Sequence, residues 1–268
     1  MSVKFAPVCP INIYEDLAAH GKETIGDYFL LLAHDVLANK ERYEKFFVTD
    51  AETNFANPPF IIMDNSVIEL GSSVSVVNLL HAAQIVNANV LAIPDVLQDG
   101  ALTILAAEQF LKDWQELTKG ESEIDLMFIP QGNHATQYEW CAKHAKENFG
   151  EHIKWIGIAR NLTGRIYNSR TQAFAALHDI FGNDVGYHML GFSEDVNDDL
   201  GTCIVNRDII VGIDSAVPLR ALEPIEAVPD SPLKIPVGPR GDWWGTVEPS
   251  DLIRDNVVKV RKFLGEIA

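Results

Sequence analysis

The sequence predicts a single α/β domain, a (β/α)8 TIM barrel. Short apolar runs of strand length alternate along the 268 residues with longer amphipathic stretches of helix length. Most of these runs are continuous, which is typical of parallel strands that are covered on both faces. The chain length is normal for one such barrel, and hydrophobic residues make up 47% of it, enough for one sizeable core.

Eight segments are predicted to be strands. Strands that alternate with helices imply right-handed βαβ units. Eight strands in a chain of this length favour a closed barrel, and an open doubly wound sheet is the alternative. The predicted strands are residues 3–8, 27–33, 60–63, 89–93, 125–129, 154–158, 187–190 and 209–213.

Amphipathic stretches between the later strands are predicted to be helices. They cover residues 76–86, 101–117, 137–148 and 169–181. Residues 251–264 are predicted to form a last helix that packs on the barrel, with Ser250 or Asp251 as its N-cap. No internal repeat or linker marks a second domain, so residues 1–268 are predicted to form one domain.

The segment before the last helix has a different composition. Residues 227–249 are rich in proline and include the pair Trp243 and Trp244, which indicates a long ordered loop. The two tryptophans are expected to cap the barrel as part of its core. The alternative is that they stack on a bound base.

Charge and cysteine usage restrict the class of protein. The net charge of −17 argues against a broad, non-specific grip on nucleic acid, although a local basic patch stays compatible with it. The N-terminus has no apolar signal segment, and no apolar run is long enough to cross a bilayer. Cys9, Cys141 and Cys203 are far apart, so neither a zinc cluster nor a disulfide framework is predicted. We therefore expect a cytoplasmic protein without a membrane partner, a metal or another cofactor.

Polar or small residues stand where several predicted strands end. The active site of a (β/α)8 barrel lies at the carboxyl ends of its strands, so these residues are expected to converge in one cup. The alternative for each aspartate is an N-cap of the following helix. The candidates, in chain order, are Asp64, Asn65, Asp95, Gln131, Gly132, Gly157, Gly191 and Asp214.

A cup with opposed carboxylates suits chemistry at the anomeric carbon of a sugar. One carboxylate can attack as a nucleophile while another supplies or removes a proton. Crowding raises the pKa of one of them. The Gln131 amide can read a purine edge, and Gly157 lets a flat ring approach the backbone. His134, beside the predicted mouth, is expected to be a solvated loop residue, and no nucleotide-loop, serine-hydrolase or zinc-protease motif is present.

The ordered series of strand ends resembles the tRNA-guanine transglycosylase superfamily. MDNS is similar to that family's DSGG segment, and the resemblance makes Asp64 the general acid/base. IPQGN resembles QGG and WIGIAR resembles IGG, which makes Gln131 and Gly157 base-binding residues. YHMLGFSEDV is similar to YLMGVGTPED, and GIDSAVPLR resembles DCVLPTR, which makes Asp214 the nucleophile. Asp95 stands where the family has a further base-recognising aspartate, and the series extends from about residue 60 to 220.

The chain departs from the family pattern in three places. It lacks the three zinc-binding cysteines and the histidine after the last strand, and it has no basic tRNA-binding appendage. Ile68 stands where the family has an aromatic residue that stacks on the base. A shorter, zinc-free chain with DN in place of DSGG looks more like the DpdA-type paralogues of phages and genomic islands, which exchange guanine in DNA for a 7-deazaguanine.

The resemblance implies a covalent base exchange. Asp214 would attack C1′ of a guanosine-type nucleotide, guanine would leave with proton transfer involving Asp64, and a 7-deazaguanine base would then displace Asp214. The implied partners are that base and the guanine site of DNA or of tRNA, and a phage-encoded chain would act in the host cytoplasm. The alternatives are a tRNA-guanine transglycosylase, a nucleoside or deazapurine-nucleoside hydrolase, and a non-catalytic partner subunit of a transglycosylase. A homodimer is one assembly that the sequence leaves open.

Overall fold

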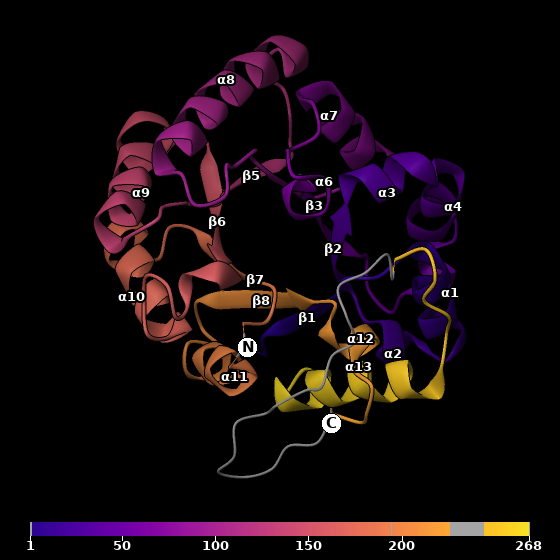
Figure 1. The fold of residues 1–268 in the computed structure, drawn as a ribbon. Helices are drawn as coiled ribbons and strands as arrows, with labels where there is room; N and C mark the ends of the chain where they lie inside the picture. Colours follow the sequence, from indigo (N-terminus) through magenta and orange to yellow (C-terminus); the bar gives the residue numbers. More distant parts are fainter. Residues whose placement is uncertain (1, 194, 226–243, 268) are drawn as a thin grey trace.

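The eight predicted strands form one parallel barrel in the computed structural model, which describes residues 2–193, 195–225 and 244–267. The sheet order is β1-β8-β7-β6-β5-β4-β3-β2, and all neighbouring strands pair in parallel. The helices surround this ring (Figure 1). The strands are β1 (Lys4–Pro7), β2 (Tyr28–Leu32), β3 (Phe60–Asp64), β4 (Val90–Ala92), β5 (Asp125–Phe128), β6 (Ile153–Ala159), β7 (Gly186–Leu190) and β8 (Ile210–Ser215).

A buried tyrosine bridges β1 and β2, the two strands at the ends of the sheet order. The Tyr14 hydroxyl donates to the carbonyl of Pro7 on β1 at 2.6 Å and lies 3.5 Å from the carbonyl of Leu30 on β2. The ring is therefore nearly closed, and the predicted (β/α)8 barrel is confirmed over an open sheet. No helix in the described part of the chain is long and apolar enough to span a membrane.

The helices predicted between the later strands are confirmed. Further helices after β1, β2, β3, β6, β7 and β8 were not predicted; each spans ten residues or fewer, so its apolar pattern is short. The helices are α1 (Ile11–Ala19), α2 (Lys22–Ile25), α3 (Ala33–Ala38), α4 (Lys40–Glu44), the π-helical turn η1 (Lys45–Thr49), α5 (Ala51–Asn54), α6 (Val67–Leu70), α7 (Val76–Ile85), α8 (Gly100–Thr118), α9 (Ala135–Phe149), the 3-10 turn η2 (Arg160–Leu162), α10 (Arg170–Phe181), α11 (Val196–Val205), α12 (Val217–Arg220) and α13 (Asp251–Phe263).

An aromatic layer fills the inside of the barrel. Tyr28 of β2 stacks on Phe60 of β3 at 5.4 Å, and Phe60 lies 5.3 Å from Trp155 of β6. Glycines on β8 and β7 make room for these rings, because a Cβ on Gly212 would lie 2.4 Å from the Tyr28 ring and one on Gly186 would lie 2.8 Å from Trp155. The barrel is therefore solid at this level.

The last helix, α13, packs against α2 and β1. The Ser250 side chain caps α13 by accepting from the backbone N–H of Ile253, so the first of the two predicted caps is correct. The fully buried Arg261 donates to the carbonyls of Glu23 and Thr24 at 2.7 and 3.2 Å. The predicted loop 227–249 lies mostly outside the described residues, and so does Trp243.

Candidate active site

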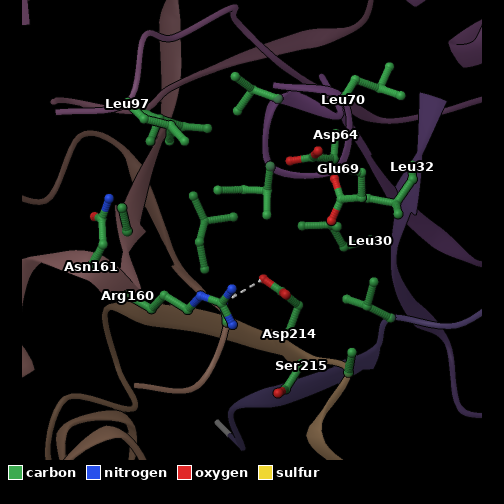
Figure 2. A pocket seen from close by; sticks show the side chains of 18 of the residues that line it. Leu30, Leu32, Asp64, Glu69, Leu70, Leu97, Arg160, Asn161, Asp214 and Ser215 are labelled. Carbon is green, nitrogen blue, oxygen red and sulfur yellow. Dashed lines mark hydrogen bonds between the residues drawn. The ribbon is translucent and has the colours of Figure 1, made fainter. Parts of the chain in front are cut away.

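A pocket of about 710 Å³ opens at the carboxyl ends of the strands. Figure 2 shows the acidic side chains of Asp64, Glu69 and Asp214 and the guanidinium of Arg160 around a common space. The position agrees with the rule for (β/α)8 barrels. Among its lining residues are Asp64, Glu69, Asp95, Gln131, Arg160, Asn161, Gly191 and Asp214.

Asp64 ends strand β3 and is partly exposed in the pocket. The chain turns sharply after it, because Ser66 adopts a left-handed conformation with φ of 63° and its backbone N–H donates to Asp64 Oδ1 at 2.7 Å. Desolvation raises the pKa of Asp64 well above its ordinary value, and the neighbouring charge of Glu69 raises it further. Both effects favour the protonated form of Asp64.

Asp214 lies in β8 and is almost fully buried at the pocket floor. Its Oδ1 lies 3.0 Å from Nε2 of His188 and accepts from the backbone N–H of Gly191 at 3.1 Å. Its Oδ2 takes neither of these bonds. Figure 2 shows Asp214 and the guanidinium of Arg160 pointing toward one another. Asp214 is therefore a carboxyl group held in one orientation at the floor of the site.

Asp95, Gln131 and Asn65 form a buried polar network beside these two aspartates. Asp95 accepts from Asn65 Nδ2 at 2.9 Å and from Gln131 Nε2 at 2.6 Å. The Oε1 atom of Gln131 accepts from the backbone N–H of Gln98 at 3.1 Å. Burial raises the pKa of Asp95 from 3.8 to about 6, while the two amide donors hold it down. Asn65 thus lies behind Asp95, and Asp95 and Gln131 line the pocket itself.

Charged residues that line the pocket were missed by sequence reasoning, among them Glu69 and Arg160. Glu69 lies on α6, five residues after Asp64, and Arg160 directly follows β6. Desolvation raises the pKa of Glu69, as does the charge of Asp214, while Arg160 lowers it. The positions of Glu69 and Arg160 depend on the backbone conformation of the short segments that follow β3 and β6. The available signals were only a carboxylate and a guanidinium close behind strand ends.

The glycine candidates separate into two groups. Gly191 lines the pocket and holds Asp214 through its N–H. Gly157 is packed inside the barrel, because a Cβ there would lie 2.8 Å from Leu190 and 2.9 Å from Ile129. A Cβ on Gly132 would lie 2.6 Å from the backbone N of Tyr138, so this glycine allows α9 to pack closely. Neither of these two glycines is among the residues that line the pocket.

The rest of the lining is largely apolar. Ile68 and Leu70 on α6 and Leu97 after β4 stay substantially exposed at the pocket. Trp244 also lines the pocket and packs against the core. His134, by contrast, caps α9 by accepting from the N–H of Gln137. The pocket therefore offers apolar side chains beside its carboxyl groups, a combination that fits a flat, partly polar ring.

Two buried polar atoms of the pocket wall have no hydrogen-bond partner among the described residues. They are Oδ1 of Asn161 and Nδ1 of His34. Burial lowers the pKa of His34, which favours a neutral imidazole. Buried polar atoms are nearly always paired, so these two are candidates to contact a bound molecule.

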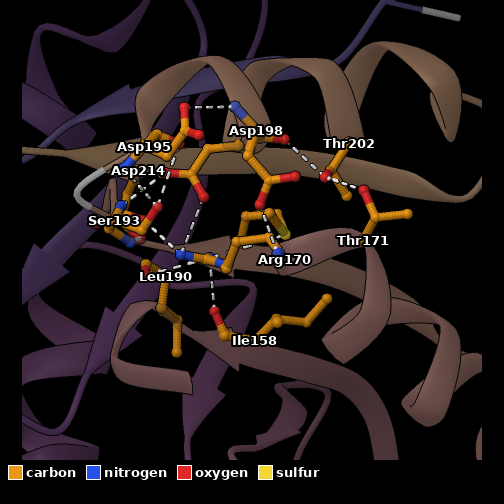
Figure 3. Close-up of polar contacts among 12 residues, drawn as sticks. Ile158, Arg170, Thr171, Leu190, Ser193, Asp195, Asp198, Thr202 and Asp214 are labelled. Carbon is orange, nitrogen blue, oxygen red and sulfur yellow. Dashed lines mark hydrogen bonds and ion pairs between the residues drawn. The ribbon is translucent and has the colours of Figure 1, made fainter. Parts of the chain in front are cut away.

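A buried ion pair supports the wall beside Asp214 (Figure 3). Arg170 of α10 is fully buried and donates to the carbonyls of Ile158 and Gly191 at 2.8 and 3.1 Å. Its Nη1 lies 3.5 Å from Asp199 of α11. Arg170 thus fixes the same Gly191 whose N–H binds Asp214.

The described part of the chain contains no group of three or more histidine, cysteine or acidic side chains arranged to hold a metal ion. The three cysteines are buried and unpaired. No protein-family model matches the chain, and no curated protein matches it either. Fold and site together define a (β/α)8 barrel with an acidic, partly apolar pocket at the carboxyl ends of its strands.

Proposed function

We propose that the chain is a base-exchange transglycosylase that replaces guanine in DNA with a 7-deazaguanine base. The observation that carries the proposal is the contrast between two acidic side chains of one pocket. Asp64 has a pKa raised by desolvation and by Glu69, whereas Oδ1 of Asp214 accepts from the N–H of Gly191 and lies 3.0 Å from Nε2 of His188. A proton donor and an oriented carboxylate are the two groups that double displacement at an anomeric carbon requires.

The proposed reaction has two displacements. An oxygen of Asp214 attacks C1′ of the nucleotide, the bond to guanine breaks, and Asp64 supplies a proton to the leaving base. A 7-deazaguanine then enters, its N9 proton passes to Asp64, and N9 attacks C1′ while the bond to Asp214 breaks. The covalent ester conserves the free energy of the glycosidic bond.

Base recognition is assigned to the network behind Asp64. Gln131 and Asp95 line the pocket and are held by Gln98 and Asn65, so they offer a rigid polar edge. Ile68 and Leu97 supply apolar surface for the flat ring. A volume of about 710 Å³ has room for one nucleotide. A base within a duplex would have to be flipped out or presented single-stranded.

A second candidate is hydrolysis of a free guanosine-type nucleoside at the same site. The net charge of −17 favours it, since repulsion of a polyanion is then no obstacle. In that reaction water replaces the incoming base in the second displacement. The same two aspartates would serve both reactions.

The test is exchange of labelled guanine, run in parallel on DNA, tRNA and free guanosine or deoxyguanosine. The proposal predicts incorporation of label into DNA by the wild type and none by Asp214→Asn. Label in tRNA alone would move the substrate to tRNA, and release of guanine without exchange would support the hydrolase. No exchange and no release on any substrate would contradict both. A gel shift at low salt completes the test, because absence of DNA binding there contradicts the DNA substrate.

A further inference from the structure

His188 lies in the interior of the barrel, directly behind Asp214. It belongs to β7 and is fully buried. Its Nδ1 lies 2.8 Å from the hydroxyl of Tyr28 on β2, and its Nε2 lies 3.0 Å from Oδ1 of Asp214 on β8. Three side chains from three strands therefore form one continuous line of hydrogen bonds that ends at the pocket floor.

The positions of the protons in this line follow from its chemistry. Burial raises the pKa of Tyr28 well above its ordinary value, so the hydroxyl keeps its proton. If Tyr28 donates to Nδ1 of His188, then Nε2 carries the ring proton and donates to Asp214. The reverse tautomer would aim the lone pair of Nε2 at the Asp214 carboxylate. A doubly protonated ring would leave the Tyr28 hydroxyl without an acceptor among its described neighbours.

The surroundings show that this line is built into the core. A Cβ on Gly212 would lie 2.4 Å from the Tyr28 ring and 2.9 Å from its hydroxyl, so the tyrosine needs a glycine on β8. Tyr28 also stacks on Phe60 and lies against the His188 ring at 5.7 Å. Burying a hydroxyl and an imidazole in an apolar core costs free energy unless both are paired. Packing alone would be satisfied by apolar side chains.

We propose that His188 is a positioning residue for Asp214 and that the Tyr28 hydroxyl fixes it in the Nε2–H tautomer. His188 and the N–H of Gly191 both donate to Oδ1. They turn the carboxylate so that Oδ2 is the oxygen that reacts.

The consequence for turnover rests on the proposed function. In the covalent intermediate Oδ2 is bonded to C1′ and the carboxyl group has lost its charge. When the entering base attacks C1′, the C1′–Oδ2 bond breaks and its electron pair returns to Asp214. The donors at Oδ1 stabilise the returning charge. Loss of the His188 donor should therefore slow the breakdown of the intermediate.

The first experiment reads the tautomer directly by ¹⁵N NMR of histidine-labelled protein, with the His188 signals assigned by their loss in His188→Gln. The expected result is a neutral His188 ring with its proton on Nε2. The Nε2 signal should shift in Asp214→Asn, and in Tyr28→Phe the ring should no longer be held in a single tautomer. A proton on Nδ1, or on both nitrogens, would overturn the proposal. This result does not depend on any substrate.

The second experiment compares single-turnover decay of the covalent adduct in His188→Leu and His188→Gln. His188→Leu removes the donor and should slow decay about tenfold, the size of one hydrogen bond to a charged group. The Gln side chain can place an N–H near the position of Nε2 and should recover most of the rate. Equal decay in wild type and His188→Leu would contradict the positioning role. If wild type forms no adduct, the proposed function fails and the NMR result alone decides the role of His188.

Discussion

Nη1 of Arg170 lies 3.5 Å from Oδ1 of Asp199, and both side chains are fully buried. Removing one partner would leave the other as an uncompensated charge in the core. Arg170→Met should therefore lower the free energy of unfolding by about 3–5 kcal/mol. It should also impair activity, because Arg170 holds the carbonyl of Gly191. Urea unfolding measures the first effect.

The control for this loss is a surface ion pair. Arg42 lies 2.6 Å from Glu15, and both side chains are exposed. Arg42→Met should change stability by no more than about 1 kcal/mol. If Arg170→Met and Arg42→Met lower the free energy of unfolding by the same small amount, the buried pair does not stabilise the wall of the pocket.

Asp95 gives a prediction for the pH dependence of stability. Its pKa is raised from 3.8 to about 6, so the folded protein binds this proton more tightly than the unfolded chain does. The contribution of Asp95 is fully present below about pH 4 and is lost as pH rises through about 6. Between these limits the unfolding free energy of Asp95→Asn should shift relative to wild type by about 3 kcal/mol, in favour of the variant.

The measurement combines denaturant unfolding at several pH values with the carboxyl ¹³C signal of Asp95. Asn at this position supplies one acceptor to the two donors from Asn65 and Gln131, so a constant penalty is expected at every pH. The pKa of Asp95 is therefore tested by how the difference in unfolding free energy between Asp95→Asn and wild type changes with pH. A midpoint near 4 for the ¹³C signal would contradict it.

Asp64 and Glu69 give a prediction for the rate. Asp64→Asn removes the proton donor and should lower the exchange rate about 10²- to 10⁴-fold. Glu69→Gln removes a negative charge that raises the pKa of Asp64, so the alkaline limb of the pH–rate profile should move to lower pH. Glu41→Gln, at an exposed position on α4, should leave the profile in place. A limb that stays fixed in Glu69→Gln would remove Asp64 from the role of acid.

Asn161 gives a prediction for substrate binding. Its Oδ1 is buried in the pocket wall, and no described residue forms a hydrogen bond with it. If it accepts from the substrate, Asn161→Ala should raise KM about tenfold and leave kcat nearly unchanged. Asn168→Ala, at an exposed position before α10, is the matched control. An unchanged KM would mean that water satisfies this atom in the complex.

The sequence predicted the barrel well because its strands are covered on both faces. Continuous apolar runs mark such strands, and all eight predicted segments overlap the observed strands. The start of α13 could also be predicted, since Ser250 is a residue type that caps helix N-termini. Asp64, Asp95, Gln131 and Asp214 line one pocket because strand ends of a barrel necessarily meet at one rim.

Other features depended on packing that no local pattern encodes. Gly157 was predicted to lie at the pocket, but it faces Leu190 and Ile129 inside the barrel. Glu69 reaches the pocket through a turn that places Ser66 at positive φ. The one sequence feature that could have indicated His188 is that it is a titratable residue within the apolar strand Gly186–Leu190. Its partners Tyr28 and Asp214 come from distant parts of the chain.

The central claim is that Asp214 forms a covalent bond to the sugar while Asp64 handles the proton. The most direct measurement is mass spectrometry of denatured protein after incubation with DNA and a 7-deazaguanine base. We predict a denaturation-stable nucleic-acid adduct in wild type, mapped to Asp214 and absent from Asp214→Ala. An adduct that persists in Asp214→Ala, or one that maps to Asp64 or Glu69, would contradict the account.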